Sequence, residues 1–266
     1  MIEMTRSNTE KTSVVSAINE KGDVVEISLV EEKPLTIFVD KEEVVTLMTM
    51  GAFPELLVMG YLRNQLIFNQ LSEIKAVQVD WQTEAVAVVS NKGKKDLTKI
   101  KERKTITTGC GQGTMYGDVM ESLNGVLMPK QRIKQTALYA LLKLLADYNK
   151  IYKTAGAVHG CALCKGENIL FFVEDVGRHN AVDTIAGYMW LNDIQGGECV
   201  FYTTGRLTSE MVIKVAQMGV PILLSRSGAT KMGFDVAKKF GVTLISRAKG
   251  RHFNILNGID NVQLDA

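Results

Sequence analysis

Helical and strand patterns alternate through the second half of the 266-residue sequence, from Lys130 onward. A long amphipathic helix comes first, because apolar residues recur at helical spacing along one of its faces. We place this face at Ile133, Ala137, Leu141, Leu144, Leu145 and Tyr148. Strands are expected at residues 157–163, 169–173, 199–202, 222–225 and 242–246, with helices between the later ones. This order predicts a three-layer α/β sandwich with a mixed sheet.

The first third of the chain has shorter elements and more strand character. Strands are expected at residues 24–30 and 35–39, separated by a polar turn, and a hairpin is expected from residues 76–79 and 85–89. One helix should begin at Pro54, because proline suits the first turn of a helix. The pattern predicts a small α+β unit.

A charged stretch over residues 91–104 separates the two parts, and charge runs of this kind are usually solvated. We therefore expect a polar tail over residues 1–15 and a smaller α+β domain over residues 16–127, which ends in a glycine loop. The larger α/β domain should occupy residues 128–266.

Composition excludes several classes of protein. The 31 basic and 29 acidic residues give a net charge of +2, which does not indicate a dedicated nucleic-acid binder. No apolar run approaches the roughly 18 residues that a membrane span needs, and the N-terminus lacks the apolar core of a signal peptide. Four unequally spaced cysteines indicate reduced thiols rather than a disulfide framework. We expect a cytoplasmic protein.

Glycines surround one of these cysteines, in the order Gly109-Cys110-Gly111-Gln112-Gly113. A backbone this free can approach a ligand closely, and its amides can stabilise a thiolate, the reactive form of sulfur. The alternative is a flexible linker with an incidental cysteine. We predict that Cys110 is a reactive thiol.

A second group of soft ligands comprises His159, Cys161 and Cys164. A Cys-x-x-Cys pair with a histidine can hold zinc. In the expected strand, however, Cys161 shares a face with His159 and Cys164 lies on the other face. No second cysteine pair is present to complete a structural site. We therefore predict buried thiols and no metal.

Polar residues follow three successive strands, where open α/β sheets place their ligand sites. Asp175, Arg178 and His179 follow the first strand, Arg206 follows the second, and Ser225 begins the loop after the third. Hydroxyls, arginine and glycine at helix N-termini favour a cradle for a phosphate or another anion. The alternative is a set of helix caps with solvated neighbours.

A basic stretch follows the last expected strand. Its cations could bind phosphates, and the aromatic ring of Phe253 could stack on a base. The alternative is a solvated basic tail. The stretch consists of Arg247, Ala248, Lys249, Gly250, Arg251 and His252.

From residue 23 to residue 254, the sequence resembles the formate dehydrogenase accessory sulfurtransferase family (FdhD-type). The most specific motif is EDVGRHNAVD at residues 174–183. The other motifs lie at residues 55–62, 108–113, 154–159, 204–212 and 225–230, and in the basic stretch after residue 244.

The resemblance implies a cytidine-deaminase-like fold for the large domain and a role in maturing molybdenum- or tungsten-dependent formate dehydrogenases. Family members accept persulfide sulfur from a cysteine desulfurase. They pass it to the bis(molybdopterin guanine dinucleotide) cofactor before the cofactor enters the apo formate dehydrogenase. The persulfide position falls on Cys110, and the site for the guanine nucleotide part falls on residues 247–252. We also expect a homodimer.

The sequence departs from the family pattern at two positions. Gly113 replaces the second cysteine of the glycine loop, so a resolving thiol must come from Cys161 or Cys164, or not exist. Arg247 replaces the usual aromatic residue. A non-catalytic chaperone for the same cofactor is therefore an alternative. A zinc deaminase is excluded. Such enzymes need His-x-Glu or Cys-x-Glu, followed downstream by Pro-Cys-x-x-Cys. Here Gly160 and Cys161 follow His159 without a glutamate, and the Cys-x-x-Cys pair is too close and lacks the proline.

Overall fold

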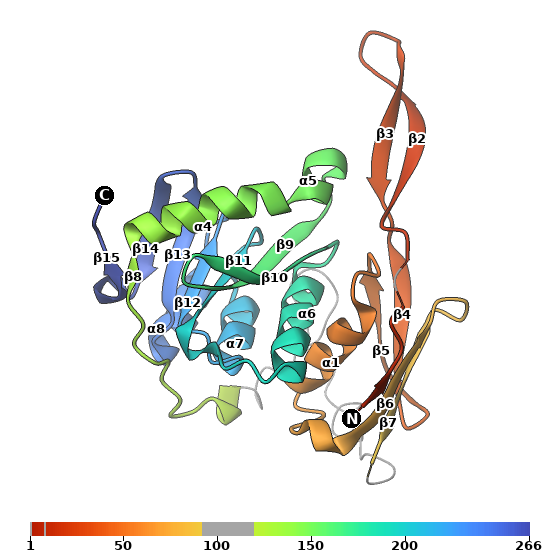
Figure 1. Ribbon diagram of the computed structural model, residues 1–266, viewed down its shortest axis with the longest axis horizontal. Helices are drawn as coiled ribbons and strands as arrows, with labels where there is room; N and C mark the ends of the chain where they lie inside the picture. The colour runs from red at the N-terminus through yellow and green to blue at the C-terminus, as the bar shows by residue number, and fades with distance from the viewer. Residues whose placement is uncertain (1, 8, 92–119) are drawn as a thin grey trace.

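The computed structural model describes residues 2–7, 9–91 and 120–266, which form a larger and a smaller sheet (Figure 1). The glycine loop around Cys110 lies outside these residues. The larger sheet consists of β9 (His159–Lys165), β10 (Asn168–Asp175), β11 (Cys199–Thr203), β12 (Ile222–Ser225), β13 (Thr243–Lys249) and β14 (His252–Asn257).

The larger sheet is mixed, as predicted. Its strand order is β10-β9-β11-β12-β13-β14; β11, β12 and β13 pair in parallel, whereas β9, β10 and β14 pair in antiparallel. All residues of β11 and β12 are buried, which explains why both strands are continuous apolar runs rather than alternating ones.

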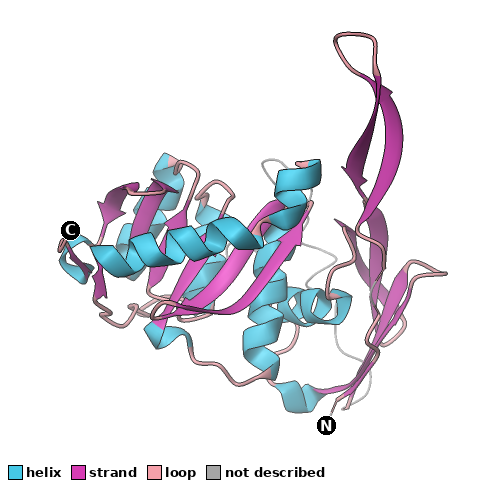
Figure 2. Cartoon of the chain, turned by 45° about the horizontal axis from the view of Figure 1, so that its top comes forward, coloured by secondary structure: helices cyan, strands magenta, loops and turns pink. Residues whose placement is uncertain are grey.

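Helices cover both faces of this sheet (Figure 2). Helix α4 (Gln135–Tyr148) lies on one face and continues into α5 (Lys150–Ala155). The other face is covered by α6 (Arg178–Leu191), α7 (Ser209–Gln217) and α8 (Lys231–Phe240). Each face has its own apolar core, so the large unit is an α/β/α sandwich.

The buried face of α4 differs from the prediction. The predicted Leu144 and Tyr148 are exposed, whereas Leu138 and Leu142, which were not predicted, are buried together with Leu141 and Leu145. Spacings of three, one and three residues define a single stripe, and the sequence pattern misplaced this stripe because leucines occur on both sides of the helix.

The smaller sheet has the strand order β1-β6-β7-β4-β5 and packs on α1 (Pro54–Asn64). Its strands are β1 (Glu3–Met4), β4 (Lys33–Val39), β5 (Glu42–Thr49), β6 (Ile74–Asp80) and β7 (Ala85–Ser90). Pro54 does begin the helix, as expected. Short 3-10 helices occupy Leu71–Glu73, Gly196–Glu198 and Ile259–Asn261.

An antiparallel hairpin, which we call the arm, projects beyond both sheets (Figure 1). It consists of β2 (Thr12–Ile18) and β3 (Val24–Val30). The strand at residues 24–30 was predicted, but its partner was not. The segment expected as a polar tail, residues 1–15, contains β1 and the beginning of β2.

The C-terminal segment also extends beyond the prediction. β13 continues past residue 246 to Lys249 and turns into β14, so the expected final strand is followed by another. Arg247 has a φ of 51° where the register between β13 and β14 shifts, which is the geometry of a bulge. β15 (Val262–Gln263) then pairs with β8 (Ile133–Lys134). The basic stretch is therefore part of a hairpin and not a solvated tail.

Helices α1 and α6 cross in backbone contact. A Cβ atom on Gly60 would lie 1.7 Å from the Asp183 carbonyl oxygen, and one on Gly187 would lie 1.9 Å from the Leu56 carbonyl oxygen. Both helices can approach this closely only because each has glycine at the crossing point. This contact joins the two parts of the chain.

We predict that Gly60→Ala lowers the free energy of unfolding by about 3 kcal/mol, because the methyl group forces the helices apart. Helix propensity alone would raise the free energy of unfolding by about 1 kcal/mol, so the sign of the measured change separates the two effects. Urea denaturation measures the change. Gly228→Ala is the control, because a Cβ there meets nothing within 4 Å. It should shift stability by less than about 0.5 kcal/mol. Equal effects of the two substitutions would contradict the close crossing.

Candidate functional site

The loops predicted as an anion cradle do converge at one edge of the larger sheet. β10, β11, β12 and β13 all end at this edge, and β9 begins there. Hydrogen bonds join the loops: Thr204 N donates to Gly160 O over 2.9 Å, Arg226 N to Thr203 O over 3.1 Å, and Arg247 N to Ser227 O over 2.9 Å. The edge is therefore a connected scaffold.

His159 lies at this edge, half-buried. Burial lowers its pKa, and the positive charges of Arg178 and Arg206 lower it further. Arg178 is buried at the first position of α6, whereas Arg206 is exposed. The structure thus brings these three predicted residues within electrostatic range, with the imidazole neutral at pH 7.

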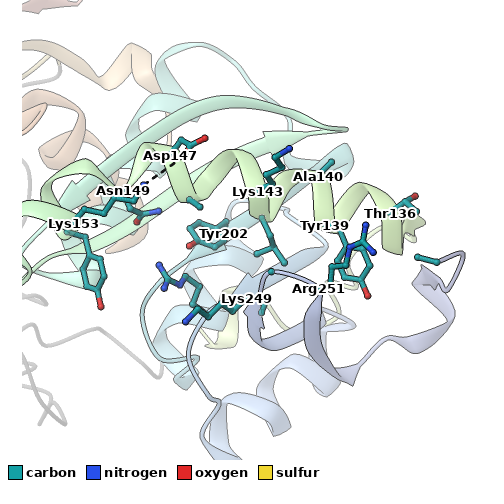
Figure 3. A pocket seen from close by; sticks show the side chains of 17 residues that line it. Thr136, Tyr139, Ala140, Lys143, Asp147, Asn149, Lys153, Tyr202, Lys249 and Arg251 are labelled. Carbon is teal, nitrogen blue, oxygen red and sulfur yellow. Dashed lines mark ion pairs between the residues drawn. The ribbon is translucent and has the colours of Figure 1, made fainter.

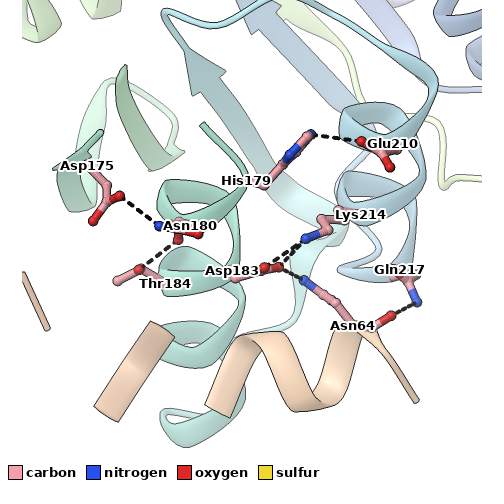
Figure 4. A network of polar contacts seen from close by, with 9 residues as sticks. All are labelled: Asn64, Asp175, His179, Asn180, Asp183, Thr184, Glu210, Lys214 and Gln217. Atoms are coloured by element: carbon pink, nitrogen blue, oxygen red, sulfur yellow. Dashed lines mark hydrogen bonds and ion pairs between the residues drawn. The ribbon is translucent and has the colours of Figure 1, made fainter. Parts of the chain in front are cut away.

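His179 faces α7 rather than the sheet edge (Figure 4). Its Nε2 lies 3.0 Å from a carboxylate oxygen of Glu210. Burial nevertheless lowers the pKa of His179, because desolvation outweighs the attraction of the carboxylate. The contact joins α6 to α7.

Asp175 and Ser225 support the backbone around them. One Asp175 oxygen accepts hydrogen bonds from Thr49 Oγ1 at 2.5 Å and Met50 N at 3.2 Å. The other accepts from Gly177 N and Asn180 Nδ2, both at 2.9 Å. Burial raises the pKa of Asp175. The Ser225 hydroxyl donates to Gly205 O over 2.7 Å and accepts from Ser227 N over 2.9 Å. Both residues hold the loops in place.

A buried ion pair fixes α6 between its neighbours (Figure 4). Lys214 Nζ on α7 donates to both oxygens of Asp183, at 2.8 and 2.7 Å. Asn64 Nδ2 at the end of α1 donates to the same carboxylate over 2.7 Å, and Gln217 Nε2 donates to Asn64 O over 3.1 Å. Three donated hydrogen bonds satisfy the buried charge, as burial of a carboxylate requires.

A cavity of about 930 Å³ opens between α4 and the turn from β13 to β14 (Figure 3). Four of the six predicted cofactor-binding residues line it: Ala248, Lys249, Gly250 and Arg251. Arg247 does not line it, and His252 lines a neighbouring cavity of about 410 Å³.

The other walls of the larger cavity were not predicted from the sequence. Tyr139 and Lys143, one helical turn apart on α4, line it on the helix side, and Tyr202 and Arg226 line it on the sheet side. The sequence shows that Tyr139 and Lys143 share a face of the helix. It contains no local signal that this face lies against a turn more than a hundred residues later in the chain. Tyr152 on α5 completes the wall.

Two guanidinium groups that line this cavity lie beside aromatic rings that also line it. The Arg251 guanidinium lies 6.0 Å from the centre of the Tyr139 ring, and that of Arg226 lies 5.8 Å from the Tyr152 ring. Burial raises the pKa of Tyr202 to about 12, so its hydroxyl stays protonated. The volume falls within the roughly 300–1,000 Å³ of small-molecule and cofactor sites. Phosphate charge and a flat base both find matching groups here.

The cysteines outside the glycine loop are all buried: Cys161, Cys164 and Cys199. Cys161 belongs to the core beneath α6 and Cys164 to the core beneath α4, which confirms the prediction that they lie on opposite faces. Burial raises the pKa of both thiols to about 12, and it also raises that of Cys199. These three thiols are therefore protonated at pH 7 and shielded from solvent.

Over residues 2–7, 9–91 and 120–266, no group of three or more His, Cys, Asp or Glu side chains is arranged to hold a metal ion. Within the same residues, no helix is both long and apolar enough to cross a membrane.

Comparison with known proteins relates this architecture to named relatives. The sulfur carrier protein FdhD of Bacillus pumilus is 31% identical over 235 residues, which cover 85% of this chain and 87% of the relative. Its namesake in Bacillus subtilis is 31% identical over 245 residues, covering 89% and 91%. A crystal structure from Desulfotalea psychrophila, of a protein named as a formate dehydrogenase accessory protein, superposes with a TM-score of 0.76. The superposition covers 95% of this chain and 98% of the Desulfotalea chain, at 24% sequence identity. It therefore supports the fold.

The model of the FdhD/NarQ family matches residues 30–263, which include most of both sheets, the connected sheet edge and the cavity beside α4. With this match and relatives 31% identical along most of their length, the chain belongs to the FdhD/NarQ family.

Proposed function

We propose that this protein is a sulfur carrier that serves the maturation of a formate dehydrogenase. Relatives of similar length are named sulfur carrier proteins, and the structural neighbour is named as a formate dehydrogenase accessory protein. The observation that carries the proposal is the burial of all three cysteines outside the glycine loop. A sulfur carrier needs an accessible thiol, and Cys110 is the candidate that this burial leaves.

In the proposed reaction, the Cys110 thiolate attacks the outer sulfur of a persulfide on a cysteine desulfurase. A new S–S bond forms on Cys110, the old one breaks, and the desulfurase cysteine leaves as a thiolate. The exchange involves no net oxidation. We place it in the cytoplasm, where thiols stay reduced. The outer sulfur is then available for the metal of the bis(molybdopterin guanine dinucleotide) cofactor, which is a substrate here.

The cavity between α4 and the β13–β14 turn is the proposed site for the guanine nucleotide end of this cofactor. Lys249 and Arg251 project from the turn, and Lys143 on α4 is among the residues that line the cavity (Figure 3). These cations suit a diphosphate, because charge-assisted hydrogen bonds to phosphate are strong. The Tyr139 ring offers a face for the base. Each of these groups belongs to α4 or to the turn between β13 and β14.

A second candidate function is a cofactor chaperone that moves no sulfur. Gly113 favours it, because the glycine loop contains a single cysteine. Both functions use the same cavity, and they differ only in what Cys110 does.

Lys249→Ala combined with Arg251→Ala should weaken the binding of guanosine diphosphate. Each lost charge-assisted contact costs about 1.5–3 kcal/mol, so the loss of both should raise the Kd by at least about 100-fold. Because both side chains are exposed, the difference should shrink as salt increases. Calorimetric titration measures the affinity. Lys238→Ala with Lys239→Ala removes the same charge from α8, on the opposite face of the sheet, and should leave the Kd nearly unchanged. Similar losses in both double variants would show a general charge effect and no defined site.

Cys110→Ala should abolish sulfur loading. After incubation with a cysteine desulfurase and free cysteine, the intact mass of the wild type should increase by one sulfur atom that a reductant removes. The Cys110→Ala variant should gain none and should fail to activate a partner formate dehydrogenase.

Cys161→Ala and Cys164→Ala are the matched controls for this experiment. Because both thiols are buried and protonated, these variants should load and transfer sulfur as the wild type does, provided that they fold. Full activation of the dehydrogenase by Cys110→Ala would reject the sulfur carrier and favour the chaperone.

A further inference from the structure

Basic side chains from several segments meet at the edge of the larger sheet where β10, β11 and β12 end. Arg178 begins α6, Arg206 lies in the loop after β11, and Arg226 directly follows β12. His159 lies at the same edge, at the start of β9. The cavity beside α4 includes only Arg226 of these four residues. The other three form a basic cluster that the proposed nucleotide site does not use.

Short contacts fix these segments against one another. Gly205 lies so close to α6 that a Cβ atom on it would meet the Cβ atom of Arg178 at 3.2 Å. Gly160, the residue after the histidine, donates its backbone N–H to Thr204 Oγ1 over 3.0 Å. The loop after β11 is therefore held between the first turn of α6 and the start of β9. This position brings Arg206 beside both.

Positive charge is in excess at this edge. Arg206 is exposed and Arg226 is half-buried, and neither forms an ion pair with a carboxylate in the described part of the chain. The acids of the preceding strand are directed elsewhere: Glu174 accepts hydrogen bonds from the first turn of α5, and Asp175 accepts from β5 and α6. A bound anion would neutralise arginine charge that these acids leave unpaired.

His159 is a hydrogen-bond donor beside this charge. Burial lowers its pKa, and the charges of Arg178, Arg206 and His179 lower it further. Asp175 lies opposite His159 in the β9–β10 ladder, but its carboxylate oxygens are bonded to donors on β5 and α6. The imidazole is therefore neutral at pH 7 and retains one ring N–H that can donate to an anion.

The ends of three helices add to the positive potential. α6, α7 and α8 all begin at this edge, and the N-terminus of a helix is the positive end of its dipole. The N-cap side chain of α8 bonds its own helix, whereas no N-cap side chain does so in α6 or α7. Guanidinium groups match the oxygens of a phosphate with two parallel hydrogen bonds. Two such groups beside helix ends favour a doubly charged tetrahedral oxyanion over a single carboxylate.

We propose that this edge binds a phosphate group, which Arg206 and Arg226 hold and to which His159 donates a hydrogen bond. Arg178 is buried and contributes its charge from behind the site. The site adjoins the nucleotide cavity at Arg226. Its phosphate can therefore be part of a nucleotide that extends out of the cavity, or it can be a separate group. The inference does not depend on sulfur transfer by Cys110.

Nuclear magnetic resonance of the histidine side chains in the full chain tests this site. The chain has three histidines, and the variants His159→Gln and His252→Gln assign their signals. Inorganic phosphate, added at constant ionic strength, should shift the His159 signal with a saturable dependence. It should also raise the pKa of His159 by about 1, because a nearby anion favours the imidazolium. His252 is exposed and reports any general salt effect, so its signal should not follow the same saturation curve.

Two variants of equal charge show whether the contact is specific. Arg206→Gln should raise the phosphate concentration at half-saturation by about tenfold, because one charge-assisted hydrogen bond is lost. Lys238→Gln removes the same charge from the last turn of α8, at the end of that helix away from the sheet edge, and should leave the half-saturation unchanged. Equal effects of the two variants would overturn the proposal. So would a His159 signal that phosphate does not move.

A titration with guanosine diphosphate identifies the source of the phosphate. If the nucleotide alone shifts the His159 signal and inorganic phosphate adds nothing, the site holds the diphosphate of the nucleotide. If inorganic phosphate still shifts the signal when the nucleotide is saturating, the site holds a separate phosphate group. Either result supports the site, and a His159 signal that responds to neither ligand rejects it. Failure of the nucleotide to bind would count against the cavity beside α4, and the phosphate titration would still decide the case of the sheet edge.

Discussion

The contact between α1 and α6 is the constraint on which the rest of the structure depends. Gly60 and Gly187 let the two backbones touch, and the Asp183 carboxylate is buried beside the crossing. Lys214 on α7 neutralises that carboxylate and donates hydrogen bonds to it, and Asn64 on α1 donates another. Neither feature is sufficient alone: the crossing without Lys214 would bury an unpaired charge, which costs several kcal/mol. Close packing and charge pairing therefore fix α6 together.

The position of α6 decides the geometry of the sheet edge. Its first turn carries Arg178 and His179, and Asp175 just before it is bonded to Thr49 and Met50 at the end of β5. The preceding acid, Glu174, accepts hydrogen bonds from Ile151 N and Tyr152 N and so holds the first turn of α5. Asp175 thus connects the smaller sheet to α6, and Glu174 connects α5 to the larger sheet. Through α5, this motif also sets the place of Tyr152 in the cavity wall.

Much of the larger sheet could be predicted because its strands are apolar runs with turn residues between them. The arm could not: β2 is a short run of serine, threonine and small apolar residues whose pairing with β3 is visible only in three dimensions. Asp175 was expected near a ligand, because loops after strands carry ligand sites. The sequence alone cannot show that its carboxylate oxygens are already bonded within the protein. Only part of the cavity lining was predicted from the sequence. Residues 248–251 were expected at a cofactor site because the family resemblance places that site at residues 247–252, whereas Tyr139 and Lys143 join them through the docking of α4 on the sheet.

The single cysteine of the glycine loop has a chemical consequence for the proposed carrier. A persulfide on Cys110 can be attacked by a second thiolate on the same chain, which would form an internal disulfide and release the sulfur as hydrosulfide. That reaction needs an accessible thiolate. Burial raises the pKa of Cys161 and Cys164 to about 12, so both thiols are protonated at pH 7, and both are fully buried. Cys199 is also buried, and burial raises its pKa as well. With Gly113 in place of a neighbouring cysteine, none of the three thiols in the described part of the chain is available to react with the loaded sulfur. A one-thiol carrier therefore keeps its sulfur until an external acceptor arrives, and the replacement of the second cysteine is compatible with sulfur transfer.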